Sequence, residues 1–345
     1  MVIKKAYTIK DIAREAGVSP SLVSFALNNT LGENGQKRYK VNDETARRIL
    51  AVAEKFHYTQ NTAARSLRSR RSRTIGVILS DISNGFFSSI ARHIEDKAFM
   101  LDYSVLFGST DENPEKLARL IRTMLGKGVD GLIVVACEHC EAIVTNVLDR
   151  NIPLVLLDRD VESVQTNRVV LDNEAACSEA VRRLYEGGYR HIEMVSYDMS
   201  VTNIAHREAG YRFEMERLGL ASNMRVHRIG YEQVDRSMAE LIASLDFNET
   251  DALIFATNSL SVAGVKEIHR LGFSISREIG VVAFDGSEAF DLYPVSIAYI
   301  RQPIEQFAHE ALTRVIRQIE HPETVPTRLV LAPNFVEGDS VRRRE

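Results

Sequence analysis

The chain has 345 residues, of which 45% are hydrophobic and 26% charged, enough for two or three compact units and unlike a disordered protein. Residues 1–73 hold 15 lysines and arginines against 6 aspartates and glutamates, a net of +9, whereas the remainder holds 28 against 41, a net of −13. A basic head on an acidic body indicates a nucleic-acid-binding module joined to a unit of another kind. Three cysteines exclude a disulfide framework, and the absence of a long apolar run predicts a cytoplasmic protein without a membrane partner.

Residues 1–58 are predicted to form a small all-α helix-turn-helix headpiece that binds DNA. Thr8 can cap a first helix, which Gly17 ends, and a second start follows at once with Ser19 as cap and Pro20 in the first turn. A third helix is expected from about Asn42. Two short helices across a tight turn are typical of a helix-turn-helix, and the alternative is an ordinary small helical bundle.

The second helix should present one face to DNA. The residues expected on this reading face are Ser21, Ser24, Phe25 and Asn28. The third helix is expected to bury Ala46, Ile49, Leu50 and Ala53. Between these two helices, residues 29–41 carry Lys37 and Arg38, which we expect to contact phosphates rather than bases.

Residues 59–73 are predicted to form a hinge helix and linker. Asn61 can cap a short helix containing Ala64, Leu67 and Arg68. A helix of about two turns does not form alone in water, so it needs a surface to dock against. Arginines around one aliphatic side chain suit a DNA minor groove, and the alternative is a solvated basic linker.

Residues 74–345 alternate buried strands with amphipathic helices, which predicts an α/β core of two doubly wound parallel-sheet lobes. The expected strands are 75–79, 103–107, 132–135, 154–157, 192–196, 253–255 and 281–284, with a helix over 87–101. Ligands in such folds bind beyond the carboxyl ends of the strands.

Polar and aromatic residues follow these strands or begin the helices after them. The candidate effector-binding residues are Asn84, Phe86, Phe87, Asp158, Arg207, Asn258, Phe284 and Asp285. Carboxylate, guanidinium and amide groups beside aromatic rings are what a sugar needs, although each residue taken singly is more often a cap or a loop residue.

No catalytic, metal or cofactor site is predicted. The sequence contains no phosphate-binding loop, no nucleophile elbow and no dinucleotide fingerprint after the first strand. Cys137-Glu-His-Cys140 has the spacing of metal ligands but lacks a second pair.

The segment Tyr7–Asn28 resembles the headpiece of the LacI/GalR family of bacterial transcription regulators, and Asn61–Leu67 resembles its hinge helix. The resemblance continues through 75–87, 169–175, 207–211, 283–287 and 300–304. It implies a homodimeric regulator, by expectation a repressor, whose second helix enters the major groove of operator DNA and whose Leu67 opens the minor groove. It also implies a small-molecule effector, by expectation a sugar, held by Asp158, Arg207, Asn258 and Asp285 beside Phe86 and Phe87.

Four residues depart from the family pattern, and they leave the effector and the operator open. Gln60 stands where the family often has proline, which should loosen the entry to the hinge. Phe25 replaces an arginine, so it either touches a thymine methyl group or packs under residues 29–41. Gly85 replaces a proline, and Ser259 replaces an aspartate. The alternatives are a purine-responsive regulator of the same architecture, a soluble sugar-binding protein without a DNA role, and an α/β enzyme with a regulatory head.

Overall fold

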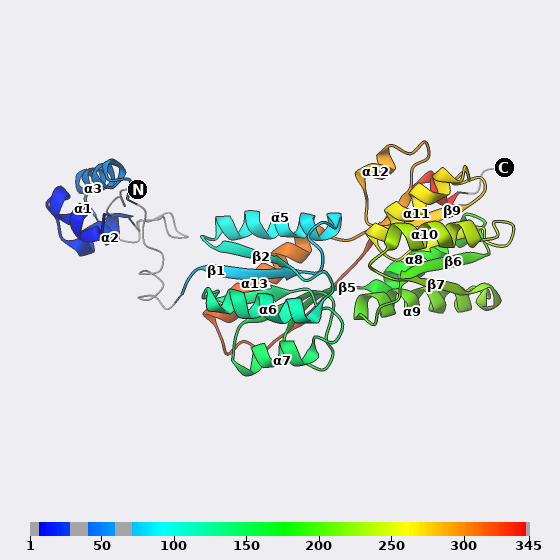
Figure 1. Ribbon diagram of the computed structural model, residues 1–345, viewed down its shortest axis with the longest axis horizontal. Helices are drawn as coiled ribbons and strands as arrows, with labels where there is room; N and C mark the ends of the chain where they lie inside the picture. The colour runs from blue at the N-terminus through cyan, green and yellow to red at the C-terminus, as the bar shows by residue number, and fades with distance from the viewer. Residues whose placement is uncertain (1–6, 28–40, 59–70, 343–345) are drawn as a thin grey trace. The chain divides into compact units, whose positions relative to one another are not determined.

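The computed structural model describes residues 7–27, 41–58 and 71–342, and its contacts divide the chain into two units, Met1–Arg70 and Arg71–Glu345 (Figure 1). We call the first unit the headpiece and the second the ligand-binding unit. Several predicted DNA-contacting residues lie outside the described residues: Asn28, Lys37, Arg38, Asn61, Ala64, Leu67 and Arg68. The domain boundaries at 58 and 73 stay predictions.

Three helices build the headpiece: α1 (Ile9–Ala16), α2 (Pro20–Leu27) and α3 (Asp43–Lys55). Thr8 caps α1 in a capping box, because its backbone N–H donates to Asp11 Oδ2 at 2.9 Å while its hydroxyl accepts from the Asp11 backbone. Gly17 ends α1 with φ of 64°, and Asn42 caps α3 by accepting from Glu44 N at 2.9 Å. The predicted helix starts are therefore confirmed.

The headpiece core differs from the prediction at two side chains. Ser24 is only 8% exposed, because α2 packs against both α1 and α3 and its buried stripe is wide enough to include this small residue. Leu50 is 49% exposed, because α3 turns Ile49 inward and the next residue lies about 100° further around the helix. Predicting Ser24 on the reading face and Leu50 in the core was therefore wrong.

The first lobe of the ligand-binding unit is a parallel six-stranded sheet in the order β11-β5-β4-β3-β1-β2. Its strands are β1 (Thr74–Leu79), β2 (Ser104–Ser109), β3 (Gly131–Val134), β4 (Leu154–Asp158), β5 (Asn167–Leu171) and β11 (Arg328–Leu331). The helices α5 (Gly85–Met100) and α13 (Ile304–Glu320) pack together, while α6 (Pro114–Gly126) and α7 (Glu141–Asp149) bury a separate cluster.

The second lobe repeats this plan in the order β12-β10-β9-β8-β6-β7. Its strands are β6 (Ile192–Tyr197), β7 (Arg225–Ile229), β8 (Ala252–Phe255), β9 (Gly280–Phe284), β10 (Ala298–Arg301) and β12 (Asn334–Val336). Its helices are α8 (Asn173–Glu186), α9 (Thr202–Arg217), α10 (Val234–Ser244), α11 (Asn258–Arg270) and α12 (Glu288–Asp291). The predicted pair of α/β lobes is confirmed, with the refinement that edge strand β12 runs antiparallel to β10.

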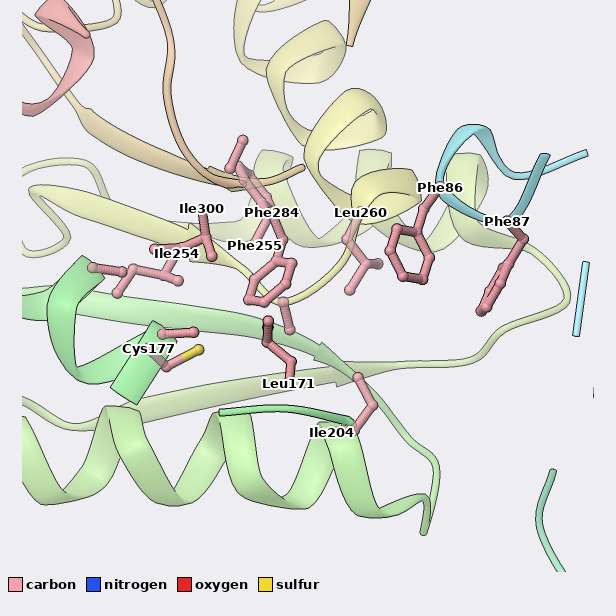
Figure 2. Packing of buried hydrophobic residues seen from close by; sticks show 14 of the residues in the cluster. Phe86, Phe87, Leu171, Cys177, Ile204, Ile254, Phe255, Leu260, Phe284 and Ile300 are labelled. Carbon is pink, nitrogen blue, oxygen red and sulfur yellow. The ribbon is translucent and has the colours of Figure 1, made fainter. Parts of the chain in front are cut away.

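The chain passes between the lobes three times, after β5, after β10 and after β11. As a result α13 belongs to the first lobe although its sequence follows that of the second (Figure 1). Apolar residues of both lobes form one large buried cluster, which includes Phe86, Phe255 and Phe284 (Figure 2). No described helix is long and apolar enough to cross a membrane.

Gly210 allows α9 to approach α8 closely. A Cβ atom at this position would lie 2.2 Å from the backbone oxygen of Glu174, so backbone rather than a flexible side chain would have to shift. We expect Gly210→Ala to lower the free energy of unfolding by about 1–3 kcal/mol. Urea titration of the full chain measures this loss. Gly126→Ala is the matched control, because a Cβ atom at this helix position would have no atom within 4 Å, and it should be neutral or slightly stabilising. Equal stability of the two variants would contradict the close approach.

Candidate ligand cleft and DNA-reading face

Two aspartates stand where strands of the two lobes end, as the sequence predicts. Asp158 is the last residue of β4 and Asp285 follows β9. Both have left-handed backbone conformations, with φ of 65° and 62°. Non-glycine residues adopt this region at a cost and are enriched at functional sites. Both carboxylates are buried, so each needs partners.

Asp158 is only partly satisfied by the protein. Its Oδ2 accepts a hydrogen bond from Asn203 Nδ2 at 2.9 Å and lies 3.8 Å from Arg159 Nε. Its Oδ1 is buried without a hydrogen-bond partner among the described residues. Burial raises the pKa of Asp158, and the positive charges of Arg207 and Arg159 oppose that rise.

Arg207 is a buried cation in α9, in the second turn of the helix rather than in a loop before it. Its Nε donates to Asn173 Oδ1 and its Nη1 to Ala256 O, both at 2.7 Å. The guanidinium carbon lies 3.6 Å from the centre of the Phe284 ring. Burial lowers the pKa of Arg207, while the charge of Asp158 raises it. These contacts hold the guanidinium in place, and its charge acts on both Asp158 and Asp285.

Asp285 is held by Gln302, which follows β10. Gln302 Nε2 donates to Asp285 Oδ2 at 3.0 Å. Asp285 Oδ1 and Gln302 Oε1 are buried without hydrogen-bond partners in the described part of the chain. Burial raises the pKa of Asp285 to about 6.

The first lobe contributes the start of α5. Asn84 caps this helix by accepting from Phe86 N at 2.9 Å, and its Nδ2 donates across to Ser259 Oγ at 3.1 Å. Serine at 259, where the family resemblance leads us to expect aspartate, thus joins the two lobes. The rings of Phe86 and Phe87 lie edge to face with centroids 5.0 Å apart.

These residues line one small cavity between the lobes. It has a volume of about 40 Å³. Seven of the eight predicted effector residues line it, namely Asn84, Phe86, Phe87, Asp158, Arg207, Asn258 and Asp285. Phe284 does not, because its ring lies beneath the Arg207 guanidinium.

The prediction missed several lining residues. The strongest pair is Arg159 with Glu112, joined by two hydrogen bonds of 2.6 and 2.7 Å with both side chains buried. Asp81 accepts from the Tyr231 hydroxyl at 3.3 Å, and the Tyr231 ring lies edge to face with Tyr197 at 5.6 Å. Five of the missed residues had a sequence signal, because they lie within two residues of the end of a predicted strand: Ser80, Asp81, Arg159, Tyr197 and Thr257. The other missed lining residues are Asn203, Ile204 and Gln302.

In the headpiece, Ser21 and Phe25 are exposed on α2, with Phe25 37% exposed. Thr8, Ser19 and Pro20 are exposed at the starts of α1 and α2. The Ser19 hydroxyl accepts from Leu22 N at 3.3 Å and so acts as a helix cap. The prediction that Phe25 packs under residues 29–41 stays a prediction, because residues 28–40 lie outside the described residues.

Two family models match the chain in the order of its units. Residues 8–61 match the model of bacterial regulatory proteins of the lacI family, and residues 181–341 match a periplasmic binding protein-like domain. The headpiece thus matches the LacI family, and the chain as a whole is similar to LacI-family regulators. It is therefore a DNA-binding transcriptional regulator with a ligand-binding domain, and not an enzyme.

Relatives within the LacI family match almost from end to end. Catabolite control protein A of Priestia megaterium is 28% identical over 96% of this chain and 97% of its own length. The ribose operon repressor of Halalkalibacterium halodurans is 29% identical over 96% of this chain and 98% of its own. A crystal structure of the lac repressor dimer bound to operator and the anti-inducer ONPF is 20% identical, covers 98% of this chain and 100% of its own, and has a TM-score of 0.82. That structure supports the fold.

Proposed function

We propose that this LacI-family regulator is a repressor whose ligand is an uncharged polyhydroxylated molecule, a neutral sugar, bound between the lobes by Asp158, Arg207, Asn258 and Asp285. The observation that supports this most strongly is the pair of buried, unpartnered carboxylate oxygens, one on each aspartate. Buried acceptors cost free energy unless they are paired, and hydroxyl groups are the donors that would pair them. Phe86 and Phe87 offer flat apolar surface for the carbon face of a sugar ring.

The charge of the cleft favours a neutral ligand over an anionic one. Four carboxylates line it, from Asp81, Glu112, Asp158 and Asp285, against the two guanidinium groups of Arg159 and Arg207. Their formal sum is −2, and Arg159 is already paired with Glu112. A phosphate or carboxylate group would therefore enter a site of its own sign at low dielectric. Sugar phosphates and sugar acids are disfavoured for this reason.

Ligand entry must move the lobes. A cavity of about 40 Å³ is too small for a sugar ring. The three interlobe connections are where a hinge movement would occur. A change in the lobe arrangement would reposition the residues that lead to the headpiece, and so change the affinity for DNA.

The ligand class is tested by thermal unfolding of the full chain with neutral mono- and disaccharides, sugar phosphates, sugar acids and purine bases. A ligand at a hundredfold excess over its dissociation constant adds about 2.7 kcal/mol, so the midpoint should rise by several degrees. We expect the rise with a neutral sugar and none with its phosphorylated form. A rise with anionic sugars only would refute the charge argument, and a rise with purines would favour the purine-responsive alternative.

For DNA recognition, we propose that α2 lies in the major groove with Ser21 and Phe25 toward base edges, while the exposed starts of α1 and α2 contact the backbone. We also propose that the protein acts in the cytoplasm, on operator DNA, as a homodimer. Phe99 and Met100 at the end of α5 are each 77% exposed, which suits burial against a second copy. Sedimentation of the full chain with a DNA duplex selected from random sequences should give two protein chains per duplex.

Ser21→Ala should weaken binding to the selected duplex. A serine hydroxyl that reads a base makes one neutral hydrogen bond, which contributes about 0.5–1.5 kcal/mol, or about two- to twelvefold in affinity. Fluorescence anisotropy with the selected and a scrambled duplex measures this loss, and the preference for the selected duplex should fall with it. Ser222→Ala, the same change at an exposed serine of the ligand-binding unit, is the control. If both variants bind like the parent chain, Ser21 does not read the operator.

A further inference from the structure

The Cys137–Cys140 segment lies between β3 and α7 and is not used by the proposed function. Glu138 and His139 form a tight turn, with His139 at φ of 56°. The two cysteines therefore occupy the first and fourth positions of a β-turn, where the Cα atoms lie within about 7 Å of each other. Disulfide bonds join cysteines at Cα separations up to about 6.8 Å, so the turn holds the pair close to bonding geometry.

The two thiols shift each other's ionisation across the turn. Cys140 stands at the N-cap of α7, where the helix dipole favours negative charge. The neighbouring Cys137 lowers the pKa of the Cys140 thiol, while Cys140 and burial raise the pKa of Cys137. Cys140 is the better nucleophile of the two.

Metal binding does not account for this pair. In the described ranges, no group of three or more histidine, cysteine, aspartate or glutamate side chains is arranged to hold a metal ion. A cavity of about 380 Å³ opens beside Cys137, lined also by Glu138, Arg159 and residues 200–202. Both cysteines are buried, and Cys137 borders this cavity while Cys140 does not, so a small oxidant can approach the pair from the Cys137 side. The third cysteine, Cys177, lies in α8 of the second lobe.

The same turn joins the two lobes beside the ligand cleft. The Glu138 carboxylate accepts a hydrogen bond from the backbone N–H of Ser200, in the loop that precedes α9. Next to the turn, Ala136 O accepts from Arg159 Nη1 at 2.9 Å, and Arg159 lines the cleft. Glu138 lies between the two cysteines, so a change of bonding between their sulfurs moves the residue that holds Ser200.

We propose that Cys137 and Cys140 are a peroxide-sensitive dithiol whose reversible disulfide loosens the Glu138–Ser200 contact between the lobes. The Cys140 thiolate attacks a peroxide oxygen, forming the sulfenic acid of Cys140 and releasing hydroxide from hydrogen peroxide. The Cys137 sulfur then displaces the sulfenic hydroxyl, the S–S bond forms, and water leaves with the Cys137 proton. A dithiol reductant restores both thiols by exchange.

The test treats the full chain with hydrogen peroxide, alkylates the remaining thiols after denaturation, and maps the peptides by mass spectrometry. We expect a Cys137–Cys140 disulfide with the mass of two hydrogen atoms lost, reversal by dithiothreitol, and the same result in Cys177→Ser. Cys137→Ser and Cys140→Ser should not form it. Hydrogen exchange at the Ser200 amide should be about tenfold faster in the oxidised protein, the effect of losing its hydrogen bond to Glu138.

Three results would overturn the proposal. The first is direct oxidation to sulfinic acid with no disulfide. The second is a disulfide that involves Cys177 instead. The third is a Cys137–Cys140 disulfide that leaves hydrogen exchange at Ser200 unchanged, which would show a bond without an effect on the lobe contact.

Discussion

Replacing Arg207 by alanine is expected to lower the free energy of unfolding of the ligand-binding unit by about 3–5 kcal/mol. The change leaves the Asn173 and Ala256 acceptors unpaired and removes the cation from the Phe284 ring. It also takes away the positive charge that opposes the raised pKa values of Asp158 and Asp285. The loss should be smaller at pH 5 than at pH 7.5, since the aspartates can then take up protons.

Urea unfolding of the full chain, followed by a signal from the ligand-binding unit, measures this loss. Arg212→Ala lies on the same helix, and its side chain is 45% exposed and 4.0 Å from Glu208. This control should change the stability by less than about 0.5 kcal/mol. Equal losses of stability in Arg207→Ala and Arg212→Ala would mean that the Arg207 charge does not stabilise the buried carboxylates of the cleft.

Replacing Asp285 by asparagine should have the opposite effect on stability. Burial raises the folded pKa of Asp285 to about 6 from its ordinary value of 3.8, so the folded state binds the proton more tightly than the unfolded state does. The contribution of Asp285 to the free energy of unfolding is therefore most favourable below about pH 4. It is lost as the pH rises to about 6, a change of about 3 kcal/mol. The amide that replaces the carboxyl group would not titrate, while Gln302 can still donate to the amide oxygen.

The stability of Asp285→Asn relative to the parent chain should thus be near zero at pH 4 and reach about 1–3 kcal/mol in favour of the variant above pH 6.5. Urea titrations across this range measure the difference. Asp291→Asn, at an exposed position of α12, should follow the parent chain at every pH. Asp285→Asn should also lose the thermal shift with the neutral sugar, because the carboxylate that we propose binds the sugar is gone. A gain in stability together with a loss of binding is the usual trade-off at a functional site. A stability difference between Asp285→Asn and the parent chain that does not change with pH would contradict the raised pKa of Asp285.

Sequence reasoning located the cleft because parallel strands end at the same edge of a sheet. Asp158 and Asp285 follow apolar strands of clear pattern, so their positions were predictable. The Arg159–Glu112 pair was not, because its two members are 47 residues apart and nothing local shows that they meet. Gln302 was missed for a similar reason, since its amide matters only through Asp285.

The fold was predicted best where strands are buried on both faces. β1 and β9 are almost wholly buried and read as continuous apolar runs. Five strands, β5, β7, β10, β11 and β12, were not predicted. Of these, β7, β11 and β12 lie at sheet edges, are partly exposed and carry polar residues. β5 and β10 lie inside their sheets, but polar residues interrupt their short apolar runs. The antiparallel pairing of β12 with β10 depends on the last interlobe connection, which has no local sequence signal.

The central claim is that a neutral sugar in the cleft changes operator affinity. Its most direct test is the affinity of the full chain for the selected duplex with and without the sugar that shifts the unfolding midpoint. We predict a change of about five- to 150-fold, the usual range of 1–3 kcal/mol for coupling between sites, and the same factor in sugar affinity when DNA is bound. Asp285→Asn should bind DNA without responding to the sugar. An affinity that the sugar leaves unchanged in the parent chain would contradict the account.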